Sequence, residues 1–257
     1  MLKPRLDDTR RGISLRALAP NAVTALALCT GLSGVRFAIA GEWERAAAAI
    51  ILAGVLDGLD GRIARMLKGE SRFGAELDSL SDVIAFGVAP ALILFLWSLQ
   101  SVPQFGWIFA LAHAVCCALR LARFNAAIDE KEQPHKSAGF LTGVPAPTGA
   151  GLTFLPLFLW LWTGNDLFRE PALVAPWAAV VAFLMISNLA TYSWSSLRLR
   201  RTIRLEAIAV IAILGGALIT APWATLSILC VLYLIAVPFS IRSYARVRRQ
   251  RRTATAG

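Results

Sequence analysis

The sequence is short of charged residues, and this shortage argues against a soluble protein. Asp, Glu, Lys and Arg together account for 16% of its 257 residues, whereas soluble domains carry nearer ~25%. A membrane-spanning helix needs about 20 mostly apolar residues in a row. Eight stretches of this kind occur, near 21–40, 46–67, 75–99, 106–127, 147–163, 172–192, 205–221 and 223–241. The sequence therefore predicts an all-α, polytopic membrane helix bundle, a single domain over residues 1–257 with little chain left for a soluble part.

Histidine and cysteine are also scarce, and neither is spaced for metal binding or for disulfides. The four cysteines all lie within apolar stretches, without the spacing of a disulfide framework or of a CxxC metal pair. Of the two histidines, His113 lies inside the fourth apolar stretch and His135 lies in a polar loop. We interpret the cysteines as small buried apolar residues and assign no ligand role to either histidine.

Acidic residues are outnumbered, and the basic residues that give the net charge of +10 are unevenly distributed. Lys and Arg gather before residue 17, at 62–72, at 120–136, at 198–204 and after 241. With eight spans, these clusters all fall on one side of the membrane, which is the positive-inside pattern. We therefore expect a multi-pass protein of the cytoplasmic (inner) membrane with both termini in the cytoplasm. Nucleic acid is not an expected partner, because no soluble basic domain presents these residues.

The two ends of the chain are expected to lie at the cytoplasmic membrane surface. Residues 1–20 combine basic with scattered apolar residues, which is typical of an amphipathic surface helix. Residues 242–257 form a basic tail. Both ends would attract anionic headgroups, so membrane lipids are expected partners.

Four aspartates stand near the cytoplasmic ends of the second and third apolar stretches, where charge near hydrocarbon is costly. They occur in "DGLDGRIAR" (57–65) and "GAELDSLSD" (74–82). Their spacing of three or four residues puts the pair in each stretch on one helix face. The connector is short, so the two helices are expected to be antiparallel neighbours whose carboxylates converge. The four are Asp57, Asp60, Asp78 and Asp82.

Clustered carboxylates repel one another, so a counter-charge is expected. Mg²⁺ and Mn²⁺ prefer oxygen ligands, and a pair of such ions suits phosphoryl transfer because it stabilises both the attacking and the leaving oxygens. Gly61 and Gly74 leave room for a bulky ligand, and Arg65 on the same face can bind phosphate. The alternative is a solvated acidic helix end, or ion pairs with Arg62, Arg65 and Arg72.

The aspartates belong to a longer pattern with fixed gaps: Asp57-x-x-Asp60-Gly61-x-x-Ala64-Arg65, eight residues, then Gly74-x-x-x-Asp78-x-x-x-Asp82. This pattern resembles the signature of the CDP-alcohol phosphatidyltransferase family, whose enzymes displace CMP from a CDP-linked lipid or alcohol with a hydroxyl nucleophile. The resemblance implies that the four aspartates hold two divalent ions, Mg²⁺ or Mn²⁺, that Asp82 also deprotonates the hydroxyl, and that the protein is a homodimer. The residues that it implies for CDP binding are Asp57, Gly61, Ala64, Arg65, Gly74 and, through a weaker "PN..T" feature, Asn21 and Thr24.

Three further stretches bear on the acceptor alcohol. "SRFGAELDSLSDVIAFGVAPA" (71–91), "ALRLARFN" (118–125) and "FLTGVPAPTGAG" (140–151) resemble the membrane-embedded bacterial phosphatidylserine synthases of that family. The resemblance implies CDP-diacylglycerol and L-serine as substrates and CMP as a product. An arginine fork suits the carboxylate of serine, although arginines near a helix end also reach lipid headgroups. The candidates for serine or phosphate binding are Arg120, Arg123, Asn125 and Lys136.

Other functions stay open at this point. Within the family, the acceptor could instead be glycerol 3-phosphate, inositol phosphate or choline. Intramembrane prenyltransferases also use Asp-rich motifs, but their Asn-Asp-x-x-Asp motif does not fit Leu56 before Asp57. A transporter would spread its carboxylates along several spans, whereas the last four stretches here carry almost none.

Overall fold

The computed structural model describes residues 15–69, 71–126, 140–192 and 204–255. Helices occupy all eight predicted apolar stretches. They are α1 (Leu15–Ile39), α2 (Trp43–Leu67), α3 (Arg72–Asp82) with η1 (Val83–Val88) and α4 (Ala89–Trp97), α5 (Pro103–Ala126), α7 (Ala146–Thr153) with α8 (Leu155–Thr163), α9 (Pro171–Ile186), α10 (Arg204–Thr220) and α11 (Pro222–Thr255). The prediction of a helical membrane protein is confirmed.

Four of these helical stretches are long and apolar enough to cross a membrane: Leu18–Ile39, Arg72–Trp97, Gln104–Ala126 and Pro222–Ala245. The predicted number of eight spans therefore stays a prediction. The expected surface helix falls mainly on residues 1–14, outside the described residues, and α1 continues from Leu15 through Pro20 without a break.

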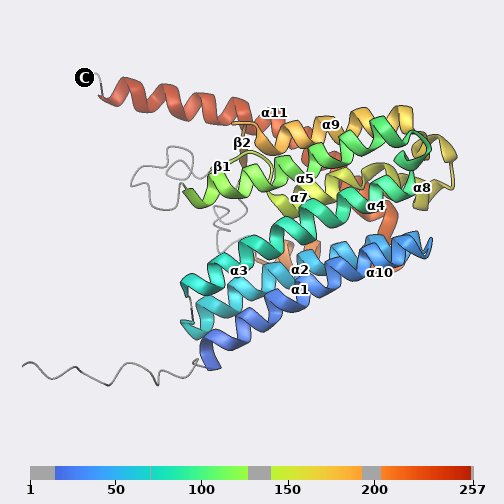
Figure 1. Cartoon of the computed structure of the whole chain (residues 1–257). Coiled ribbons are helices and arrows are strands. Elements are labelled where there is room, and N and C mark those ends of the chain that lie inside the picture. The colour runs from blue at the N-terminus through green and yellow to red at the C-terminus, as the bar shows by residue number, and fades with distance from the viewer. Residues whose placement is uncertain (1–14, 70, 127–139, 193–203, 256–257) are drawn as a thin grey trace, which may run out of the picture.

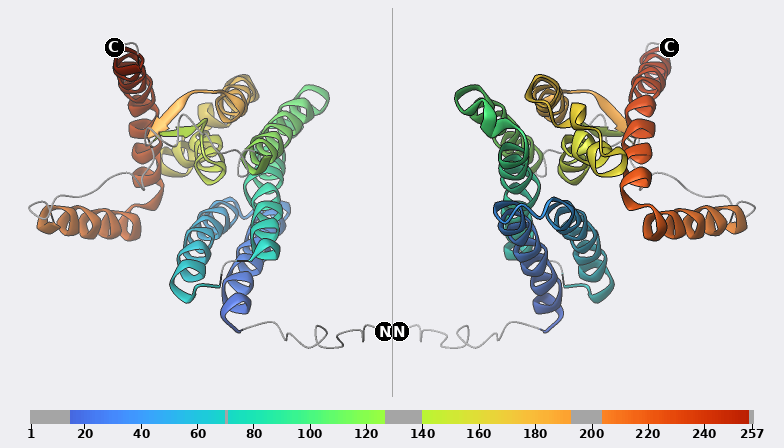
Figure 2. Two further views of the ribbon diagram at one scale, coloured as in Figure 1. Left: turned by 90° about the vertical axis from the view of Figure 1, so that its left-hand side faces the viewer. Right: turned by 90° about the vertical axis from the view of Figure 1, so that its right-hand side faces the viewer.

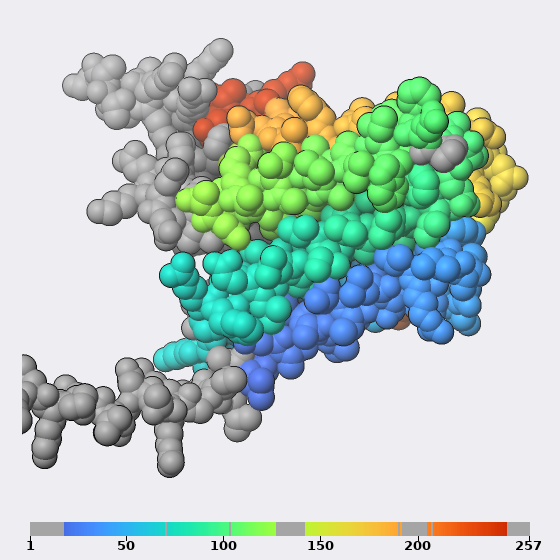
Figure 3. Space-filling view, in the orientation of Figure 1, coloured from blue at the N-terminus to red at the C-terminus, as the bar shows by residue number. Residues whose placement is uncertain are grey.

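The helices lie in two groups that run roughly alongside each other (Figure 1). The first group holds α1, α2 and the stretch from α3 to α4, with α1 packed along α2; in the second, α5 packs on α9 and α11 packs on α8. On the face shown in Figure 3, α1, the α3–α4 stretch and α5 form successive bands. The α3–α4 stretch also contacts α5, so it joins the two groups.

Helix α10 is set apart from this bundle. Figure 2 shows it extending away from α11, its packing partner. Its apolar side chains are largely exposed, including Ile211, Ile213 and Ile219.

Short irregular elements complete the described chain. Two 3₁₀ turns, η2 (Leu99–Ser101) and η4 (Asp166–Arg169), lie at one end of the bundle. Strands β1 (Phe140–Thr142) and β2 (Ala190–Tyr192) form an antiparallel pair. The Thr191 hydroxyl donates to the Gly143 carbonyl over 2.8 Å and closes this pair onto the start of α7.

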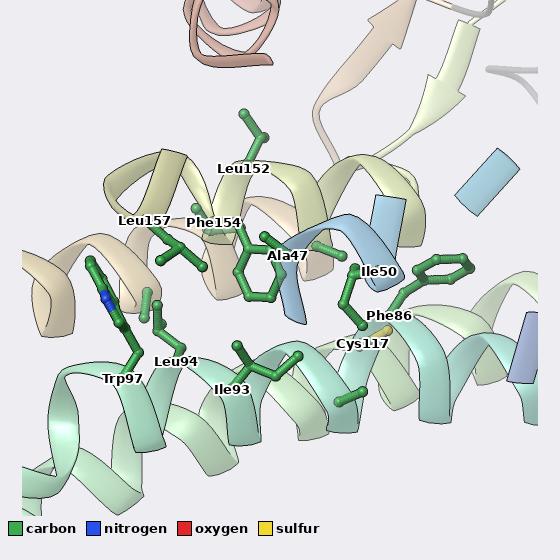
Figure 4. Close-up of a cluster of buried hydrophobic side chains, with 14 of the residues drawn as sticks. Ala47, Ile50, Phe86, Ile93, Leu94, Trp97, Cys117, Leu152, Phe154 and Leu157 are labelled. Carbon is green, nitrogen blue, oxygen red and sulfur yellow. The ribbon is translucent and has the colours of Figure 1, made fainter. Parts of the chain in front are cut away.

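The hydrophobic core lies where α4 meets α7 and α8. Figure 4 shows Ile93, Leu94 and Trp97 of α4 with Leu157 of α8 and Phe154, which precedes it, all in one buried cluster. Buried alanines on α2 let that helix pack closely against the same cluster. The core therefore holds the end of the α3–α4 stretch that lies farther from the aspartates.

Candidate metal centre and substrate site

The chain reverses direction between the end of α2 and the start of α3, and the aspartates of the two helices therefore lie opposite one another. Lys68 takes a left-handed backbone conformation, φ 50°, and ends α2. Ser71 then caps α3, its hydroxyl accepting a hydrogen bond from the Gly74 backbone N–H over 3.0 Å. Such a cap stabilises a helix start by ~1 kcal/mol.

The structure brings Asp57, Asp60 and Asp78 together. Ligand oxygens of the three lie within 4.8 Å of one another, close enough for one divalent cation to touch all three. Asp60 is 5% exposed, while the other two are half-buried. Asp82 lies outside this group of three, with its carboxyl in hydrogen-bonding reach of Asp57. It therefore stands beside the cluster, one helical turn beyond Asp78.

Helix α1 supports the aspartates from a third side. The buried Thr24 hydroxyl donates to Asp60 Oδ2 over 2.6 Å, and the Ser81 hydroxyl reaches the Thr24 carbonyl over 3.3 Å. A Cβ atom at position 74 would lie 2.8 Å from Asn21 Oδ1. Gly74 thus makes room for the Asn21 side chain, where the sequence predicted room for a ligand.

Within the described ranges, no basic side chain forms an ion pair with Asp57, Asp60 or Asp78. The ion pair found there joins Arg45 to Glu42, on a different part of the molecule. Arg62, Arg65 and Arg72 are exposed and form no ion pair with the aspartates, so the alternative of an ion-paired helix end is not what the structure shows. Partly buried carboxylates without a protein cation form an all-oxygen donor set that fits Mg²⁺ or Mn²⁺.

The two arginines of "RLARFN" have different environments. Arg123 donates to the Ile186 carbonyl over 3.0 Å, to Asn188 Oδ1 over 2.8 Å and to the Ser187 carbonyl over 3.3 Å. Its guanidinium therefore binds the C-terminal end of α9. Arg120 is largely buried and interacts electrostatically with Asp82, yet its Nε has no hydrogen-bond partner among the described residues.

The remaining acceptor-site candidates are placed less directly. Asn125 Nδ2 donates to the Ser79 hydroxyl over 3.0 Å, so Asn125 contacts α3 on the helix that carries Asp78. Lys136 lies outside the described residues. Ala64 is half-buried on α2, one turn beyond Gly61.

Sequence reasoning missed Tyr233 of α11. Its side chain interacts electrostatically with Arg120, although the two residues lie far apart in the chain. A tyrosine inside an apolar run gives no signal of this contact. Ser81 was more accessible to prediction, because Ser81, Ala85 and Ala89 are small residues that continue the face of Asp78 at helical spacing.

Comparison with known proteins identifies the family. A sequence model described as CDP-alcohol phosphatidyltransferase matches residues 17–191, which include the four aspartates and extend from α1 to β2. The chain belongs to the CDP-alcohol phosphatidyltransferase family. A second model, described as CDP-alcohol phosphatidyltransferase 2, matches residues 202–238, so the resemblance extends into α10 and α11.

Several curated relatives carry the same name, CDP-diacylglycerol–serine O-phosphatidyltransferase. The one from Mycobacterium bovis is 37% identical over 241 residues, which is 94% of this chain and 82% of the relative. The one from Helicobacter pylori is 30% identical over 85% of this chain and 88% of its own length. A relative from Saccharomyces cerevisiae is 38% identical over 47% of this chain and 45% of its own.

Proposed function

We propose that this protein is a CDP-diacylglycerol–serine O-phosphatidyltransferase of phospholipid biosynthesis. It would transfer the phosphatidyl group of CDP-diacylglycerol to the hydroxyl of L-serine, giving phosphatidylserine and CMP. The observation that carries the proposal is the shared name of relatives that match 94% of the chain, together with a cluster of three carboxylates that form no ion pair among the described residues. The alternatives with other acceptors share the metal centre and differ in the acceptor pocket.

Asp57, Asp60, Asp78 and Asp82 would hold the divalent ions, with the first three forming the tighter group. When bound, two Mg²⁺ or Mn²⁺ ions would neutralise the carboxylates and the CDP diphosphate and stabilise the attacking and leaving oxygens. Thr24 would fix the Asp60 carboxylate through its 2.6 Å hydrogen bond, as residues behind metal ligands commonly do.

Asp82 is the proposed general base. Its carboxylate would accept the proton of the serine hydroxyl as the serine oxygen bonds to the lipid phosphorus and the bond to the CMP oxygen breaks. Its carboxyl lies outside the group of three and interacts electrostatically with Arg120 on α5, which places it towards the proposed serine site. A positioned base contributes typically ~10²–10⁴-fold to a rate.

Nucleotide and acceptor would bind on opposite sides of the aspartates. Gly61, Ala64 and Arg65 on α2 would contact the CDP moiety, with Asn21 and Gly74 beside them. On α5, the buried Nε of Arg120, which has no hydrogen-bond partner among the described residues, favours Arg120 over Arg123 as the residue that binds the serine carboxylate. An unsatisfied buried donor of this kind costs ~1–3 kcal/mol, which an anionic ligand would recover. Asn125 and Lys136 remain candidates for the same pocket.

The finer topology belongs to the same proposal. Eight helical passes would cross the inner membrane, with both termini and the aspartates on the cytoplasmic side, where dissolved serine can meet a lipid donor. The proposed surface helix over residues 1–20 falls mainly outside the described residues, and residues 1–257 would act as one domain. The uneven distribution of Lys and Arg supports this orientation, and the family resemblance supports a homodimer.

An acceptor assay tests the proposal. Purified protein would receive CDP-diacylglycerol and Mn²⁺ with serine, glycerol 3-phosphate, inositol phosphate or choline in turn, and CMP release would be followed. We expect release with serine and its loss on chelation by EDTA. Release with glycerol 3-phosphate but not with serine would contradict the acceptor and leave the family mechanism intact.

A further inference from the structure

The helix that carries Asp78 and Asp82 changes its winding directly after Asp82. Asp82 ends α3, and the next six residues form the π-helical segment η1, in which the Ala89 N–H bonds to the Ile84 carbonyl five residues back. Segments of this kind are rare and are frequent at functional sites. The segment separates the aspartates from the part of the helix that packs in the core.

Pro90 explains part of this change. In an α-helix, the carbonyl of Phe86 would accept a hydrogen bond from the N–H of residue 90, but proline has no N–H to donate. Phe86 is fully buried, so its carbonyl needs a donor from elsewhere.

His113 of α5 supplies that donor. Its Nε2 lies 3.1 Å from the Phe86 carbonyl oxygen, and its Nδ1 lies 3.1 Å from the hydroxyl of Thr153 in α7. Both side chains are fully buried. A carbonyl can only accept, so Nε2 carries the hydrogen and the Thr153 hydroxyl donates to Nδ1. One neutral imidazole thus joins three elements.

Close packing reinforces this arrangement on the same face of α5. A Cβ atom at position 87 would lie 3.0 Å from Cys117 Cβ, so Gly87 allows α5 to approach the backbone of η1. Cys117 lies one turn beyond His113, and Arg120 lies on the following turn. The face of α5 that holds η1 therefore continues towards Arg120.

We propose that His113 is a positioning residue for the metal centre, acting through the Phe86 carbonyl to hold η1 in its π-helical winding. Without that donor η1 would lose its tie to α5, and a change of its winding by one residue would turn α3 by about 100° relative to α4. That rotation would carry Asp78 and Asp82 away from Asp57 and Asp60 on α2. The inference rests on the proposed function, because it takes the aspartates as metal ligands.

Mn²⁺ binding to the purified full-length protein tests this role without relying on activity. Free Mn²⁺ would be measured by electron paramagnetic resonance during titration of wild type and of His113→Phe, His113→Gln and Thr153→Val. We expect His113→Phe to weaken Mn²⁺ binding about tenfold, equal to ~1.4 kcal/mol, since it removes the donor to Phe86. His113→Gln keeps an N–H donor at a similar reach and should stay within about threefold of wild type, with Thr153→Val between the two.

A matched control separates positioning from general stability. Ser98 directly follows α4, at the end of the α3–α4 stretch away from the aspartates. Its buried hydroxyl donates to the Arg169 carbonyl over 2.6 Å. Ser98→Ala should lower thermal stability and leave Mn²⁺ binding unchanged. In activity assays, His113→Phe should lower kcat and raise the Mn²⁺ requirement, with the KM for serine unchanged within about twofold.

Wild-type Mn²⁺ binding by folded His113→Phe would overturn the inference. If that variant does not fold, wild-type Mn²⁺ binding by Thr153→Val, or a loss of Mn²⁺ binding of about tenfold in folded His113→Gln, would overturn it equally. Absence of Mn²⁺ binding by the wild-type protein would overturn the proposed metal centre as well, so the two failures are distinguishable.

Discussion

The two ends of the helical stretch from α3 to α4 differ in whether the charged side chains there have partners within the protein. Near Trp97, the cation of Arg169 is paired inside the protein: its Nε donates to the Trp97 carbonyl over 2.9 Å, and its guanidinium lies 5.7 Å and 5.6 Å from the ring centres of Trp43 and Trp160. At the other end, the carboxylates of Asp78 and Asp82 form no ion pair among the described residues, and Arg120 acts on Asp82 only as a nearby charge.

This difference implies that one end of the α3–α4 stretch serves mainly stability and the other end serves mainly function. Charge that is internally satisfied contributes to packing, whereas partly buried charge left without a partner costs free energy unless a ligand supplies it. Substitutions at the Trp97 end should therefore change folding, and substitutions at the aspartate end should change chemistry. Four experiments would sharpen or break this contrast.

The largest effect is expected for Asp82→Asn, which removes the proposed base but keeps the shape of the side chain. Turnover should fall by ~10²–10⁴-fold, measured as CMP release, while the folded protein still binds CDP-diacylglycerol in the presence of Mn²⁺. Thermal stability should not decrease. Substantial residual activity would show that Asp82 is not the base.

At the opposite end, Trp97→Ala should unfold the protein more easily without changing its chemistry. Trp97 is 1% exposed and packs edge-on against Trp160, so its loss should cost ~3–5 kcal/mol of unfolding free energy. Unfolding measured in bicelles would give this value. A normal kcat per folded molecule is expected, and a selective loss of kcat would break the contrast.

The two arginines of α5 give a smaller, paired comparison. Arg120→Ala should raise the KM for serine ~10–100-fold with little change in the KM for the lipid, because a hydrogen bond to a charged group is worth ~1.5–3 kcal/mol. Arg123→Ala should mainly lower stability, since Arg123 bonds the end of α9. If only Arg123→Ala raised the KM for serine, Arg123 rather than Arg120 would be the residue that binds the serine carboxylate.

The smallest effect is expected for Thr24→Val, which deletes the hydroxyl that holds Asp60 and keeps the side-chain volume. Loss of a group behind a metal ligand typically weakens metal affinity ~10–100-fold, and we expect the lower end of that range. The Mn²⁺ titration of the variant measures it. Thr225→Val is a suitable control, since the Thr225 hydroxyl donates to the nearby Ala221 carbonyl, directly before α11.

Much of the site was accessible to sequence reasoning because it depends on local spacing. The intervals between Asp57 and Asp60 and between Gly74, Asp78 and Asp82 set one face on each helix. The short connector limits how far apart the two helices can lie, although both pack on α1 rather than on each other. That was enough to predict converging carboxylates. The same local reasoning could not distinguish Arg120 from Arg123, because which of them is already bonded depends on where α9 ends.

The sequence by itself determined the helical membrane architecture, the family signature and the grouping of carboxylates on two helices, since hydropathy and helical period act over short distances. Only the tertiary structure decided what surrounds them. It placed Thr24 on Asp60 and Arg123 on α9, and it gave His113 the carbonyl that Pro90 leaves without a donor. Each of these contacts joins residues far apart in the chain, and a hydrogen bond between such residues is fixed by packing rather than by spacing.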